Sequence, residues 1–162
     1  MSNNPDSRLL PSLLDRLTTP SAAVSSSDPD PDRPRQINQL RNQVMRDLEY
    51  LLNSRRALAD FPPDRDHLNR SLLTFGIPDF SDKGRVEMLS DDLKHAVAQA
   101  ISRFEPRLSE VRIEIDDEWQ GSHVLRFHIS ALLNVEPERE PVSFDTLMAL
   151  DTRKFEVQGG SA

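Results

Sequence analysis

The sequence predicts an α+β fold, in which a three- to four-stranded antiparallel sheet packs against two main helices and a tethered N-terminal amphipathic helix precedes them. Apolar residues recur every three or four positions over 35–56 and 91–104, the spacing of a buried helix face. From residue 111 onward apolar and polar residues alternate, as in strands with one buried face. The helices should therefore cover the apolar face of the sheet.

Composition restricts the kinds of function that are plausible. The chain has 162 residues, no cysteine and a formal net charge of -7. One domain fits this length, and the absence of cysteine excludes a disulfide framework and a thiolate metal site. The negative charge disfavours nonspecific binding to nucleic acids and anionic membranes. No stretch approaches the roughly 20 apolar residues of a membrane-spanning helix, and residues 1–7 lack a signal-peptide pattern. We expect a cytoplasmic protein that needs no cofactor or metal.

The first 18 residues contain a predicted amphipathic docking helix. Its apolar stripe consists of five leucines at helical spacing: Leu9, Leu10, Leu13, Leu14 and Leu17. This stripe either packs on the core of its own chain or docks in a groove on a partner. Residues 19–34 are rich in serine, aspartate and proline, which is linker composition, and precede a domain expected over 35–158.

The helix predicted over 35–56 buries one face and ends in an arginine pair, Arg55 and Arg56, that would cap its C-terminal end. Residues 57–83 form an irregular connection. Within it a short helix is expected over 69–75, with Leu72, Leu73 and Phe75 pointing inward. Gly76 would end this short helix in a left-handed conformation.

The second long helix should begin at Ser90, a good N-cap residue, and end near Phe104. Pro106 explains the ending, because its ring removes a donor and pushes the preceding residue out of the helical region. Glu105 and Arg107 are left at a corner between helix and sheet. They are either two solvated charges at a helix stop or a rigid polar fork that docks another protein.

Four strands are predicted, over 111–115, 124–135, 142–148 and, as a short final piece, 154–157. An open sheet of this kind has edges whose unpaired N–H and C=O groups can accept another strand. The stretches 111–115 and 142–148 are the candidate edges.

Four motifs in order carry a resemblance to a known family: LLPSLLDRL at 9–17, RDLEYLLNSRR at 46–56, LTFGIPD at 73–79 and FEPRL at 104–108. Their order and spacing resemble the TssE family, baseplate subunits of the type VI secretion system. That family is related to the phage-tail wedge proteins of the GPW, lysozyme-like family. The similarity covers most of the chain, about residues 8–144.

The resemblance implies a non-enzymatic structural subunit of a contractile injection system. Family members sit in the baseplate wedge with TssF, TssG and TssK, around the VgrG hub, in a cytoplasmic baseplate docked at the inner membrane complex. Glu105, Pro106 and Arg107 are implied to dock on the helical bundle of the TssF–TssG wedge. An edge strand is implied to template the first ring of the TssB–TssC sheath.

Two alternatives from other classes remain open. The first is a peptidoglycan-cleaving, muramidase-like enzyme, since six acids lie between Glu105 and Glu118. Such an enzyme needs two carboxyl groups about 5 Å apart, or about 6.5–9.5 Å apart, and an apolar pocket around the general acid. The second is an adaptor outside secretion, which would bind through the leucine helix without affecting sheath assembly.

Overall fold

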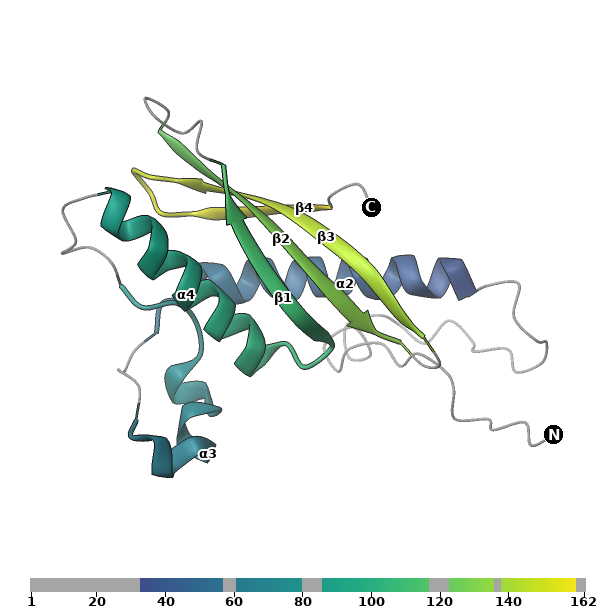
Figure 1. Ribbon diagram of the computed structural model, residues 1–162, viewed down its shortest axis with the longest axis horizontal. Helices are drawn as coiled ribbons and strands as arrows, with labels where there is room; N and C mark the ends of the chain where they lie inside the picture. The colour runs from purple at the N-terminus through teal and green to yellow at the C-terminus, as the bar shows by residue number, and fades with distance from the viewer. Residues whose placement is uncertain (1–32, 57–60, 80–85, 117–122, 136–137, 160–162) are drawn as a thin grey trace, which may run out of the picture.

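A computed structural model describes residues 33–56, 61–79, 86–116, 123–135 and 138–159, with side chains throughout these ranges except at 63 and 86–90. The predicted leucine helix over 1–18 and most of the linker lie outside the described residues. Figure 1 gives the arrangement of the elements. In chain order they are α2 (Arg33–Asn53), η1 (Pro63–Arg65), α3 (Asp66–Asn69), η2 (Leu72–Thr74), α4 (Val86–Phe104), β1 (Leu108–Ile115), β2 (Val124–Asn134), β3 (Arg139–Ala149) and β4 (Phe155–Gly159).

The four strands form one antiparallel sheet in the order β1-β2-β3-β4. Helix α4 packs on β1 and α2 packs on β4, so both helices cover the same face of the sheet (Figure 1). Leu48 of α2, Ile101 of α4 and Phe144 of β3 are fully buried in the core between these layers. The predicted α+β class is confirmed. None of the described helices is long and apolar enough to cross a membrane.

Helix α2 is displaced by two to three residues from its predicted limits. It begins at Arg33, because Pro34 can occupy the first turn, where a missing N–H costs nothing. It ends at Asn53, so the predicted cap by Arg55 and Arg56 is wrong. Arg55 instead forms an isolated parallel bridge with Ile77.

Helix α4 ends at Phe104 as predicted, and its last hydrogen bond runs from the Glu105 N–H to the Ile101 carbonyl (2.8 Å). Its predicted start is wrong, because the helix begins at Val86 and Ser90 lies inside it. The residues between, Glu-Met-Leu, are good helix formers and extend the helix toward the N-terminus.

Strand β1 contains a bulge that the alternation did not reveal. Glu110 has a φ of 53°, and the register with β2 shifts between Ser109 and Arg112. One extra residue therefore separates Leu108 from Val111, and both side chains still point to the helix-covered face. The strand consequently begins at Leu108, three residues before the predicted start.

The edges of the sheet are β1 and β4. The prediction that 142–148 forms an edge is wrong, because β4 pairs with β3 over Phe144 to Met148. The prediction that 111–115 lies at an edge is confirmed. Because the short strand β4 pairs with residues 144–148 of β3, the backbone groups on that side of these residues are not available to another strand.

The segment 61–79 projects from the body near α3 (Figure 1). Phe75, predicted to point inward, packs against the core, and Ile77 is part of it, whereas polar contacts hold the rest of the segment together. Leu72 and Leu73 are 86% and 48% exposed, so their predicted inward orientation is wrong. Thr74 is buried instead and donates to the Asn69 carbonyl (2.7 Å). The Asn69 amide in turn bonds both backbone groups of Phe61, at 2.7 and 2.9 Å. These side chain to backbone bonds turn the chain tightly and leave the leucines outside.

Gly76 joins this segment to the end of α2. Its φ is +100°, the left-handed conformation that the sequence predicted. A Cβ at this position would lie 2.2 Å from the Ser54 carbonyl oxygen. That oxygen also accepts from the Ile77 N–H at 2.9 Å. Only glycine fits this close approach of two backbones.

Gly76→Ala is expected to lower the free energy of unfolding by at least about 2 kcal/mol, because a left-handed non-glycine residue costs roughly 1–2 kcal/mol and the contact with Ser54 must also be relieved. Urea denaturation would measure the change. Gly159→Ala is the matched control, since its Cβ would meet nothing closer than Arg41 Nη2 at 3.7 Å. Equal effects of the two substitutions would contradict this account of Gly76.

Candidate docking interface

The corner between α4 and β1 is a turn over Glu105 to Leu108. The Leu108 N–H donates to the Glu105 carbonyl at 3.1 Å, and Pro106 occupies the second position of the turn, where proline is favoured. The turn brings the side chains of Glu105 and Arg107 together, because they flank the rigid ring.

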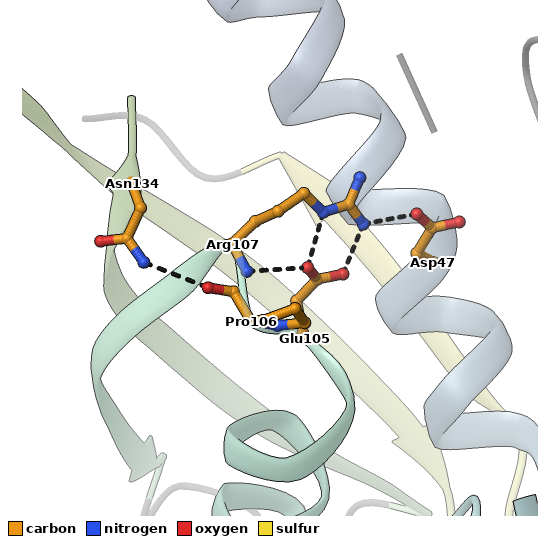
Figure 2. Close-up of polar contacts among 5 residues, drawn as sticks. All are labelled: Asp47, Glu105, Pro106, Arg107 and Asn134. Atoms are coloured by element: carbon orange, nitrogen blue, oxygen red, sulfur yellow. Dashed lines mark hydrogen bonds and ion pairs between the residues drawn. The ribbon is translucent and has the colours of Figure 1, made fainter. Parts of the chain in front are cut away.

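Glu105 and Arg107 form a bidentate pair (Figure 2). Arg107 Nε donates to Glu105 Oε1 at 2.6 Å, and Nη2 donates to Oε2 at 2.5 Å. The Arg107 backbone N–H also approaches Oε1 at 3.3 Å. Glu105 is only 4% exposed, so the interpretation of Glu105 as a solvated charge is wrong. Arg107 compensates a buried carboxylate with the strongest geometry that side chains offer.

A third member of the group comes from α2, 60 positions earlier in the chain. Arg107 Nη2 also donates to Asp47 Oδ2 at 2.5 Å. Nothing in the sequence connected Asp47 with the corner. An acid at the boundary of a buried face was the available signal. The contact ties α2 to the junction between α4 and β1.

The end of β2 holds the turn from the other side. The Asn134 N–H donates to the Arg107 carbonyl at 2.8 Å, and Asn134 Nδ2 donates to the Pro106 carbonyl at 3.2 Å (Figure 2). Ser109 Oγ donates to Asn134 Oδ1 at 2.8 Å. These bonds fix the backbone of the corner, and no sequence pattern pointed to Asn134.

The electrostatics of the group keep Arg107 charged. Burial alone would lower the pKa of Arg107, but hydrogen bonds and the nearby charges of Glu105 and Asp47 more than reverse this, so the pKa is raised. The guanidinium therefore stays protonated at every pH at which the protein is studied.

One nitrogen of the guanidinium, Nη1, takes no part in these contacts. Within the part of the chain that the structure describes, Arg107 Nη1 has no hydrogen-bond partner, and it points away from both carboxylates (Figure 2). The Arg107 side chain keeps 26% of its exposure, and Pro106 is exposed. The corner thus presents a rigid ring beside an oriented, charged donor.

The chain was compared with models of known protein families. Residues 38–138 match the model described as "Baseplate wedge protein gp25". The chain belongs to the gp25 baseplate wedge family. The matched range includes most of α2, the corner and the first two strands. Membership of this family identifies the protein as a structural component of a phage tail-like baseplate. No curated protein and no solved structure matches the chain significantly.

The contacts of Glu105 in the wedge protein argue against the muramidase alternative. Both Glu105 oxygens accept from Arg107, whereas a general acid must present one to the substrate. Of the other acids in this stretch, Glu110, Glu114 and Asp116 are exposed, and 117–118 lie outside the described residues. Across the described ranges, no three His, Cys, Asp or Glu residues are arranged to hold a metal ion.

Arg107→Ala is expected to lower the free energy of unfolding of the wedge protein by about 1–3 kcal/mol, because it leaves the buried Glu105 carboxylate without its partner. The geometry therefore predicts that this variant does not fold with wild-type stability. Chemical denaturation would measure the loss. Arg112→Ala, at an exposed position of β1, is the matched control and should change stability by less than about 0.5 kcal/mol. A stability loss no larger than that of the control would show that the pair contributes nothing.

Proposed function

We propose that this gp25-family protein is the TssE subunit of a type VI secretion baseplate wedge. It docks on TssF and TssG through Glu105, Pro106 and Arg107, and it templates the TssB–TssC sheath through a sheet edge. The observation that supports the proposal is that Arg107 Nη1 has no partner among the described residues, while two carboxylates of the same chain hold Nε and Nη2.

Glu105 and Asp47 have a positioning role in this proposal. They engage Nε and Nη2 and so fix the direction in which Nη1 points. Such preorganisation reduces the entropy lost on binding, because Arg107 does not have to become ordered when the partner arrives. The exposed Pro106 ring beside it supplies a rigid apolar contact. A carboxylate or a set of helix-end carbonyls on the TssF–TssG bundle is the complementary acceptor.

The edge at β4 is a poor candidate for receiving a sheath strand. Asn53, the last residue of α2, accepts from the Phe155 N–H and donates to the Phe155 carbonyl, each at 2.9 Å. A side-chain amide therefore occupies the outer backbone groups at the start of this strand. Helix α2 packs along β4, with Gly159 near Arg41 and Met45. An incoming strand would have to break both bonds between Asn53 and Phe155.

The N-terminal half of β3 extends past the end of β4 but is also protected. Its pairing with β4 begins at Phe144, so residues 139–143 have no β4 partner in the described chain. The Ala149 N–H bonds the Lys154 carbonyl, which places the odd-numbered backbone groups of β3 on the β4 side. Pro141 belongs to this set, so a missing donor faces outward. Proline at such a position discourages strand addition.

The edge at β1 is open. The Asp116 N–H donates to the Arg126 carbonyl, so the even-numbered residues after the bulge face β2. The N–H and C=O groups of Val111, Ile113 and Ile115 point outward, and within the described ranges no hydrogen bond engages them. We therefore assign sheath templating to β1.

The remaining contacts follow from the same assignment. The five leucines over 9–17 provide a second attachment to the same baseplate. That baseplate also contains TssK, surrounds the VgrG hub and lies in the cytoplasm at the inner membrane complex. Two modest contacts joined by the linker over 19–34 gain affinity through effective concentration.

Docking is expected to require the guanidinium rather than charge alone. Arg107→Lys keeps the charge but loses the outward N–H pair and the fork to Glu105. In a pull-down of the full chain with co-expressed cognate TssF and TssG, the variant should bind at least about tenfold more weakly, since a charged hydrogen bond contributes roughly 1.5–3 kcal/mol.

Two controls separate docking from folding. The pull-down is run below the melting temperature of the variant, which circular dichroism measures. Arg112→Lys, on β1, should bind like the wild type. Wild-type capture by a folded Arg107→Lys variant would refute docking through the corner.

The choice of edge has its own test. Ile113→Pro removes an outward N–H from β1 and should abolish capture of the TssB–TssC sheath subunits, while Ile113→Ala, which keeps that N–H, should retain most of it. Hydrogen exchange is expected to show that the backbone N–H groups of Val111 and Ile115 become protected in the complex. Undiminished capture by Ile113→Pro would show that the sheath does not use β1.

A further inference from the structure

The open edge at β1 carries two opposite charges on the face of the sheet that the helices leave uncovered. Arg112 and Glu114 are both exposed, and they are successive residues of that face because side chains alternate along a strand. Within the described ranges, neither side chain has a hydrogen-bond or ion-pair partner. The edge therefore presents an unpaired cation and an unpaired anion side by side.

The neighbouring residues on β2 do not engage these two charges. Arg112 lies opposite Ser130, which is uncharged, and Glu114 lies opposite His128. The Nδ1 atom of His128 lies 2.8 Å from Asp145 Oδ1 on β3, so this ring nitrogen is engaged on the side away from β1. Both charges thus remain for a residue that arrives on the outer side of β1.

The other face of the same edge is apolar. Val111, Ile113 and Ile115 are half-buried and pack against the core, and α4 packs on β1. A strand added to β1 would continue this face, so every second residue of that strand has to be apolar. A charged side chain there would be removed from water without a partner, which is strongly unfavourable.

The bulge at Glu110 sets one end of the receiving surface. Its φ of 53° interrupts the regular alternation, and Glu110 Oε1 already lies 3.5 Å from Arg139 Nη1. Regularly spaced outward backbone groups therefore begin at Val111 and, in the described chain, continue to Ile115. On this short stretch an added strand meets Arg112 and Glu114, one charge of each sign.

We propose that β1 selects a strand in which apolar residues alternate with two outer residues of opposite charge. The acidic residue lies beside Arg112 and the basic residue lies beside Glu114. Cross-strand pairs of opposite charge stabilise a sheet, whereas like charges destabilise it, so a strand with two acidic or two basic outer residues is disfavoured. The rule applies to parallel and antiparallel addition, because either direction requires one charge of each sign.

This inference rests on the proposed role of β1 as the edge that receives a sheath strand, and it adds which strands that edge accepts. The test uses the full chain and three short synthetic peptides with valine or isoleucine at alternate positions. Their two central outer residues are glutamate and lysine, two glutamates, or two lysines, and threonine fills the other outer positions. Methylation of alternate backbone nitrogens keeps the far edge of each peptide from pairing with further peptides.

NMR titration that follows the backbone N–H signals of Val111, Ile113 and Ile115 would locate the binding and give its Kd. The mixed peptide should bind at least about threefold more tightly than either like-charged peptide. This preference should weaken as salt is added, because both charges are exposed.

Charge reversal at the edge should change the preference. Arg112→Glu should favour the two-lysine peptide, and Glu114→Lys should favour the two-glutamate peptide. Glu156→Lys is the matched control, because it reverses an exposed charge on β4, at the opposite edge of the sheet. This control should keep the preference of the wild type for the mixed peptide.

The outcomes separate the charge rule from the proposed function. Equal binding of the three peptides at β1, or a preference that neither Arg112→Glu nor Glu114→Lys changes, would overturn the charge rule and leave β1 as a receiving edge. If no peptide shifts the signals of Val111, Ile113 and Ile115, β1 does not accept strands, and the assignment of sheath templating to this edge fails as well.

Discussion

The structure depends most on the bond between the Arg107 guanidinium and the buried Glu105 carboxylate. A carboxylate with 4% exposure is strongly destabilising unless its lost hydration is replaced. Arg107 replaces it with two hydrogen bonds and then reaches Asp47 on α2. The same guanidinium therefore compensates a charge, closes the corner between α4 and β1, and joins that corner to the other long helix.

This arrangement connects stability with docking. The two carboxylates engage Nε and Nη2 of the guanidinium and leave Nη1 without a partner among the described residues (Figure 2). A partner would meet a donor whose position is already determined by the fold. The contacts that stabilise the corner are thus the same contacts that would make it a selective surface, so evidence on docking has to be separated from evidence on folding.

In the described sheet, three stretches of strand backbone have no neighbouring strand on one side, and they differ in how that side is protected. Asn53 closes β4 with a side-chain amide, Pro141 removes a donor from the free half of β3, and β1 keeps its outward groups open. Natural proteins protect edges because unpaired strands aggregate. An unprotected β1 beside two protected stretches is therefore the pattern expected if one edge serves assembly.

The sequence by itself determined the fold class, the buried stripes of α2 and α4, the end of α4 at Phe104 and the left-handed Gly76. These features follow from periodicity and from the local chemistry of proline and glycine, which act within a few residues. The tertiary structure decided the partner of Arg107, the strands at the sheet edges and the exposure of Leu72 and Leu73. Asp47 is 60 positions from Arg107, and the order of the sheet depends on the pairing of all four strands. Contacts between distant segments depend on how packed layers meet, and no local pattern encodes them.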